Sequence, residues 1–137
     1  MKRVGVLPIA SLLLILLSTA TLADEFKMRS SPLAPAATAS IHANSDRNGN
    51  LDITLEAKHL APPDRLAQPH TVYVVWIQAP GKESQQLGVL RVNTDDMAAS
   101  LRTKTPYRSF DLFVTAEDSP QPAAPSSAEV LRGSVQK

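Results

Sequence analysis

The stretch that most constrains the fold is the run TVYVVWI at residues 71–77, which holds the only tryptophan of the chain, Trp76. β-branched and aromatic residues of this kind favour a strand. Because successive side chains of a strand point to opposite faces, one face would carry Trp76 and two valines, and the other would carry Tyr73, Ile77 and the third valine. Both faces are apolar, so we expect this strand to be covered on both sides or to lie at the centre of a sheet.

The first 23 residues have the pattern of a secretory signal peptide. Lys2 and Arg3 give a positive start, an apolar run with LLLILL at its centre follows, and small residues precede the polar Asp24. An uncleaved membrane anchor is the alternative, since about 20 apolar residues can span a bilayer. Pro8 and the small residues at the end favour cleavage. We therefore expect a secreted or periplasmic protein with no membrane insertion after the signal is removed.

Composition excludes several classes of function. The chain has no cysteine, which rules out disulfides, thiolate metal sites and thiol catalysis. Of its 14 Lys and Arg residues, Lys2 and Arg3 lie in the expected signal peptide. The rest of the chain has 12 basic and 13 acidic residues, which gives it a net charge of −1. A chain so close to neutral, without a basic cluster in its sequence, is not typical of nucleic-acid binding or of binding to anionic lipids.

The remainder of the chain divides into a spacer and one domain. Residues 24–38 are polar and then Ala/Pro/Ser-rich, which predicts a flexible spacer. From residue 39 to residue 137, apolar and polar residues alternate between close turn signals, with no convincing helical stretch. This pattern predicts an all-β, immunoglobulin-like antiparallel sandwich of about seven strands. The expected strands are residues 39–44, 51–58, 71–77, 86–92, 97–104, 110–117 and 129–135.

Three further details of this sandwich can be predicted. Inward residues must pair with inward residues, so the first hairpin has either Ala43 opposite Leu55, with a three-residue loop, or Ala43 opposite Ile53, with a five-residue loop. We expect Trp76 to pack toward the strand face that begins with Phe110. The first and last strands, which are weak or charged, should form the sheet edges.

Two segments resemble a known family. Residues 72–90 (VYVVWIQAPGKESQQLGVL) are similar to the tyrosine, tryptophan and turn pattern of the extracytoplasmic C-terminal domain of anti-sigma-K factors. Residues 110–133 (FDLFVTAEDSPQPAAPSSAEVLRG) are similar to the "V-T-x-E" strand, Pro-rich loop and "V-L-x-G" on which those domains end. The resemblance implies an extracytoplasmic β-sandwich. Because the expected signal peptide comes first, we expect neither the sigma-binding domain nor the internal transmembrane helix of those regulators. The loop at Asp118 also lacks their usual glycines, so the sigma-binding activity is not carried over.

One segment could bind a cation. Asp46, Asn48, Asn50 and Asp52 fall at alternate positions of DRNGNLD, and oxygen ligands at such spacing can hold calcium. The glycine is one position away from its place in an EF-hand loop and the distal glutamate is absent, so a solvated turn is the simpler interpretation.

The other candidate residues match no catalytic or metal-binding motif. His42, His59 and His70 lack ligand spacing, and no serine lies in a nucleophile-elbow motif. Tyr107 and Phe113 could form an exposed aromatic contact patch. Phe113 shares its expected strand face with Asp111, Thr115 and Glu117, normally the wetter side, and we expect a neighbouring loop to cover it rather than a binding hot spot. We assign no catalytic, cofactor-binding or metal-binding residue and expect a non-enzymatic protein-interaction or envelope-sensing module with an unknown protein partner in the cell envelope. The alternative is a small cation- or ligand-binding secreted protein that uses the Asp46–Asp52 turn.

Overall fold

The computed structural model describes Gly5 and residues 24–137. The predicted signal peptide, residues 1–23, lies outside the described residues apart from Gly5. The described chain is all-β, with a single short 3-10 turn, η1 (Pro63–Arg65), and no α-helix. Its nine strands are β1 (Asp24–Ser30), β2 (Thr38–Ser45), β3 (Leu51–Lys58), β4 (Val72–Gln78), β5 (Gln85–Leu90), β6 (Val92–Asn93), β7 (Ala98–Thr105), β8 (Ser109–Glu117) and β9 (Glu129–Gln136).

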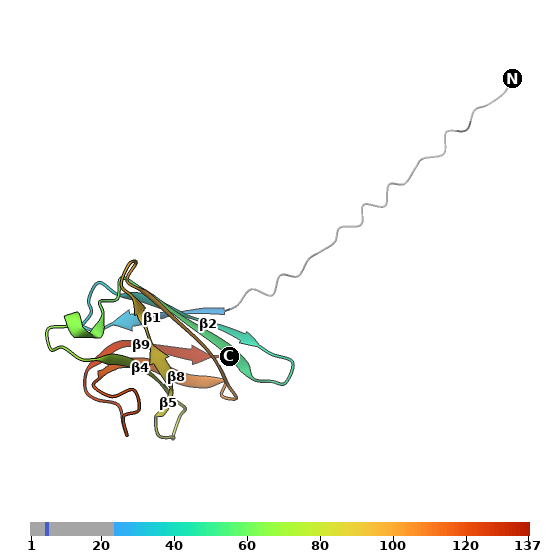
Figure 1. Cartoon of the computed structure of the whole chain (residues 1–137). Coiled ribbons are helices and arrows are strands. Elements are labelled where there is room, and N and C mark those ends of the chain that lie inside the picture. The colour runs from blue at the N-terminus through green and yellow to red at the C-terminus, as the bar shows by residue number, and fades with distance from the viewer. Residues whose placement is uncertain (1–4, 6–23) are drawn as a thin grey trace.

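The nine strands form one antiparallel sheet in the order β5-β4-β8-β9-β1-β2-β3-β7-β6. Its two outermost strands, β5 and β6, follow each other in the sequence with only Arg91 between them. The sheet therefore curls until its two ends meet at Arg91, and it is nearly closed (Figure 1). Near this seam the Leu101 side chain of β7 lies so close to Gly88 of β5 that a Cβ added to this glycine would be 3.4 Å from Leu101 Cδ1.

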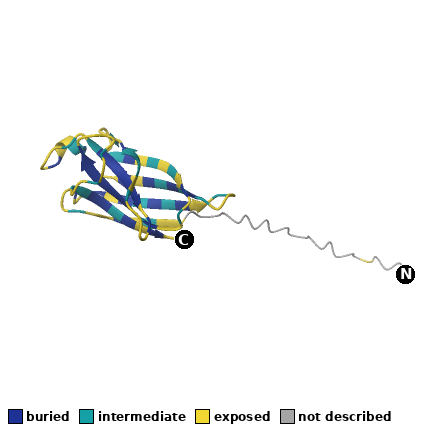
Figure 2. Cartoon of the chain, turned by 90° about the horizontal axis from the view of Figure 1, so that it is seen from below, coloured by how far each residue is buried: buried dark blue, intermediate teal, exposed yellow. Residues whose placement is uncertain are grey.

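The core fills the inside of the curled sheet. Inward residues of β2 and β3, such as Ile41 and Leu55, meet those of β4 and β8, such as Val75 and Leu112, and all four are almost completely buried. Buried and exposed residues alternate along β2 and β3 (Figure 2). β4 and β8 are buried on both faces for most of their length, as the two apolar faces of residues 71–77 predicted for β4.

All seven predicted strands are present, and the all-β antiparallel class is confirmed. The predicted strand at residues 86–92 is split at Arg91 into β5 and part of β6. In the first hairpin, Ala43 lies opposite Ile53, which is the register with the five-residue loop.

The prediction of a flexible spacer at residues 24–38 is wrong for residues 24–30. Its first part forms β1, in which Phe26 and Met28 turn toward the core and the charged residues between them turn outward. β1 pairs with β2 through residues 24–28 and with β9 through Arg29 and Ser30, so it joins the two halves of the sheet. The apolar and charged residues of β1 alternate over only a few positions, and an Ala/Pro/Ser-rich stretch follows directly. The sequence pattern therefore did not indicate a strand here.

The predicted edge strands and the predicted side of Trp76 are also wrong. β2 and β9 are interior strands because β1 lies between them, and the edges are β5 and β6. Trp76 lies opposite Phe113, on the outer face of β4 and β8, whereas Phe110 turns into the core. When both faces of a strand are apolar, the periodicity does not reveal which one turns inward.

Candidate functional site

The Asp46–Asp52 turn, for which cation binding is the alternative to a simple solvated turn, forms ion pairs with a lysine. One carboxylate oxygen of Asp46 accepts hydrogen bonds from the backbone N–H groups of Asn48 (2.8 Å) and Asn50 (2.9 Å). The Lys104 Nζ of β7 lies 3.1 Å from the other Asp46 oxygen and 3.3 Å from a carboxylate oxygen of Asp52. The ammonium group therefore supplies the positive charge that two neighbouring carboxylates require.

The titration of this ion-pair group follows from its contacts. Burial raises the pKa of Asp46, but hydrogen bonds from Lys104, Asn50 and Asn48 outweigh burial and leave that pKa below its usual value. Hydrogen bonds to Asp46 and Asp52 raise the pKa of Lys104. The lowered pKa of Asp46 and the raised pKa of Lys104 both favour the charged forms of the two side chains. Among the described residues, no group of three or more His, Cys, Asp or Glu side chains is arranged to hold a metal ion.

The three histidines lie in three different places. His42 of β2 has its Nε2 atom 3.5 Å from a Glu56 oxygen on β3, and His70 has its Nδ1 atom 3.2 Å from an Asp118 oxygen. His59 follows β3 and has a positive φ of 55°. The structure does not bring them together.

Tyr107 and Phe113 do not form a common aromatic patch. Phe113 is only 4% exposed, stacks on Trp76 with ring centroids 6.5 Å apart, and is covered by the Arg132 guanidinium at 4.3 Å from its ring centroid. Tyr107 packs against the main core and lies under Lys82. The outer face of β4 and β8 is thus a second small core, closed by a cation–π contact.

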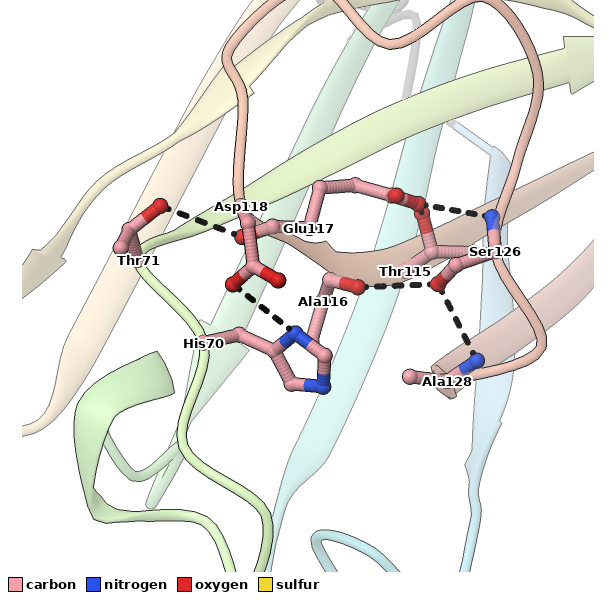
Figure 3. Close-up of polar contacts among 8 residues, drawn as sticks. All are labelled: His70, Thr71, Thr115, Ala116, Glu117, Asp118, Ser126 and Ala128. Atoms are coloured by element: carbon pink, nitrogen blue, oxygen red, sulfur yellow. Dashed lines mark hydrogen bonds and ion pairs between the residues drawn. The ribbon is translucent and has the colours of Figure 1, made fainter.

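A buried polar chain continues from this small core (Figure 3). The Trp76 Nε1–H donates to Thr115 Oγ1 (2.8 Å), the Thr115 hydroxyl donates to Glu117 Oε2 (2.5 Å), and the Ser126 backbone N–H donates to the same oxygen (2.9 Å). Glu117 is only 6% exposed. Sequence reasoning had placed Thr115 and Glu117 on a wet face, because polar residues alternate with apolar ones there.

The polar chain holds the Pro-rich loop, residues 118–128, against the sheet. The Ser126 hydroxyl donates to the Ala116 carbonyl (2.9 Å) and accepts from the Ala128 N–H (3.2 Å), so the loop is anchored at its far end (Figure 3). No buried side-chain N or O atom of the described part of the chain lacks a hydrogen-bond partner. We interpret the Glu117 group as a structural clamp.

A large hollow lies on the outer face of β1, β2 and β3, with a volume of about 900 Å³. Outward side chains of the three strands form its floor, and residues 35–37, between β1 and β2, form part of its lining. We name it the basic hollow after three of its lining residues, Lys27, Arg29 and Lys58, which are all exposed. Sequence reasoning missed it because Lys27 and Arg29 belong to the segment predicted as a spacer, and Lys58 becomes their neighbour only through strand pairing.

The strand register sets the layout of the basic hollow. Lys27 of β1 is paired with Ser40 of β2, which is paired with Glu56 of β3, and Thr38 is paired with Lys58 in the neighbouring row. Since adjacent strands are roughly 4.8 Å apart and alternate residues of one strand roughly 7 Å apart, the polar groups of these rows lie within reach of one bound segment.

Comparison of the chain with protein-family models, with characterised proteins and with solved structures finds no match. In the part of the chain that the structure describes, no helix is long and apolar enough to cross a membrane.

Proposed function

We propose that this chain is an exported, non-enzymatic β-sandwich protein that acts as a protein-interaction or envelope-sensing module in the periplasm or outside the cell. The observation that carries the proposal is the basic hollow: a concavity of about 900 Å³ on the outer face of the sheet, lined by charged, hydroxyl and small apolar side chains. An open hollow across three strands, with mixed polar and apolar lining, suits a segment of another protein better than a small molecule, because small-molecule sites bury most of their ligand.

The family resemblance supports an extracytoplasmic role. The two segments similar to anti-sigma-K factor domains, residues 72–90 and 110–133, contribute β4, β5, β8 and part of β9, and these four strands are neighbours in the order β5-β4-β8-β9. Segments that are separate in the sequence thus contribute to one continuous region of the sheet. We propose that the chain is a sensor-type domain of that kind, without the sigma-binding activity.

We also propose that the nearly closed sheet is a variant of the immunoglobulin-like sandwich. In support, β1 changes partner along its length: residues 24–28 pair with β2, and Arg29 and Ser30 pair with β9. Such a strand allows one continuous sheet to behave as two packed layers, one containing β2, β3, β7 and β6 and the other containing β9, β8, β4 and β5.

The buried polar residues favour a binding role over a catalytic one. Thr115 and Glu117 bond to each other, to Trp76 and to the Ser126 backbone, and Thr105 accepts a hydrogen bond from the Tyr107 N–H at 3.2 Å. These groups stabilise the fold. The cation-binding alternative at the Asp46–Asp52 turn is weakened because the Lys104 ammonium group already forms an ion pair with both carboxylates.

Site-specific photo-crosslinking in living cells tests the proposal. A photoreactive amino acid at Thr38, an exposed residue of the basic hollow, should cross-link one defined envelope protein. The same amino acid at Gln136, an exposed residue of β9 outside the hollow, serves as the control. Equal labelling from both positions, or labelling of no defined protein from Thr38, would contradict the proposal.

A further inference from the structure

We infer that the partner segment bound by the basic hollow is an extended, acidic stretch of polypeptide that lies along β1. This inference rests on the proposed function and adds the chemistry of the partner. It follows from which charged side chains of the hollow have no ion-pair partner in the described chain, from how they are spaced, and from the shape of the surface around them.

The acidic residues of the hollow are engaged and its basic residues are not. Glu25 accepts a hydrogen bond from the Ser40 hydroxyl at 2.9 Å, and Glu56 faces His42 at 3.5 Å. Lys27, Arg29 and Lys58 form no ion pair with any carboxylate of the described chain. The hollow holds these three cations and two glutamates, a net charge of +1, and its cations are the groups that have no ion-pair partner in the described chain.

The spacing of the cations matches an extended chain. Lys27 and Arg29 are alternate residues of β1 and point to the same face, roughly 7 Å apart along the strand. Carboxylates at alternate positions of an extended peptide have the same repeat, so two of them can face Lys27 and Arg29 together. Lys58 of β3 is paired with Thr38 of β2, on the side of the hollow away from β1. It can therefore bind a third acidic group across the hollow.

The lining favours a peptide over a lipid surface. A flat membrane does not enter a concavity, and a uniformly anionic surface cannot keep its negative charges on the cations and away from Glu25 and Glu56. A peptide can place its acidic side chains on the cations and its backbone or hydroxyl groups near the two glutamates. The small apolar residues at 35–37 leave space for such a chain.

Fluorescence anisotropy with a short labelled peptide of alternating Glu and Ser tests this inference. The exported chain should bind this peptide, and binding should weaken as salt is raised, since the contacts are exposed. Replacing the three cations together (Lys27→Gln, Arg29→Gln, Lys58→Gln) should weaken binding about tenfold or more, since several exposed ion pairs are lost at once. The same sequence with Lys in place of Glu should not bind.

A matched variant separates the site from net charge. Arg47→Gln, Arg65→Gln and Lys82→Gln remove the same charge from exposed positions outside the hollow and should leave peptide binding unchanged. Unchanged circular dichroism and melting would show that both triple variants are folded.

Three results would overturn the inference. They are absence of peptide binding by the wild-type chain, equal loss in both triple variants, and stronger, equally site-dependent binding to vesicles rich in phosphatidylglycerol. The last result would assign the hollow to a lipid headgroup. Because cross-linking from Thr38 does not depend on acidity, it can still succeed when the peptide fails, and the two proposals are tested separately.

Discussion

Replacing Thr115 by valine tests whether the buried polar chain stabilises the fold. Valine has nearly the shape of threonine but lacks the hydroxyl that accepts from Trp76 Nε1–H and donates to Glu117. The indole N–H would then be buried without an acceptor, which costs about 1–3 kcal/mol, and the Glu117 carboxylate would lose one of its two donors, which adds about 1–2 kcal/mol. We expect the free energy of unfolding to fall by about 3 kcal/mol.

Urea denaturation followed by circular dichroism measures this change, because it does not depend on the tryptophan signal. Thr54→Val is the matched control, since the Thr54 side chain lies half-buried on the outer face of β3; it should change stability by less than about 0.5 kcal/mol. A double-mutant cycle with Trp76→Phe isolates the first bond and should give a coupling of about 1 kcal/mol. A Thr115→Val variant as stable as wild type, or an additive cycle, would refute the clamp.

Three further predictions concern other parts of the fold. Gly133→Ala should destabilise the protein by about 1–3 kcal/mol in urea, because the new Cβ would lie 3.0 Å from Met28 Cγ between β9 and β1; an unchanged midpoint would show that this junction can shift. Burial raises the pKa of Tyr73 to about 12, so the protonated phenol stabilises the fold fully below pH 10 and this stability, about 2–3 kcal/mol, is lost as the pH rises toward 12. Tyr73→Phe should remove that part of the alkaline decline, and identical declines in both proteins would contradict it. Wild-type protein should melt at the same temperature in calcium and in EDTA, because the Lys104 ammonium group already occupies the space between the Asp46 and Asp52 carboxylates; a higher melting temperature in calcium would revive the cation-binding alternative.

Several features of the fold were predictable because they depend on local pattern. Alternation of apolar and polar residues, the apolar run at residues 71–77 and the turn signals together located the seven predicted strands. Matching of inward residues reduced the first hairpin to two registers, one of which is observed. The Pro-rich stretches were correctly expected to lie outside strands. The two apolar faces of residues 71–77 correctly predicted an interior strand.

The errors share one physical origin. Three predictions were wrong: the side of the sheet on which Trp76 lies, the identity of the edge strands, and the role of residues 24–30. Each depends on which strand lies next to which. Phe26 and Met28 alternate with charged residues over too few positions to indicate a strand by themselves, and they gain their burial only where β2 and β9 meet them. The hollow could not be predicted for the same reason, since Lys27 and Lys58 come together only through the pairing of β1, β2 and β3.

The sequence by itself determined that this chain is built from short strands, where most of them begin and end, and that residues 71–77 form an interior strand. These are properties of neighbouring residues, and they follow from the alternation of side chains along an extended backbone. The tertiary structure alone decided that Trp76 lies outside the main core, that β1 joins the two halves of the sheet, and that three cations surround one hollow. Those outcomes depend on pairing between strands far apart in the chain, which no local pattern specifies.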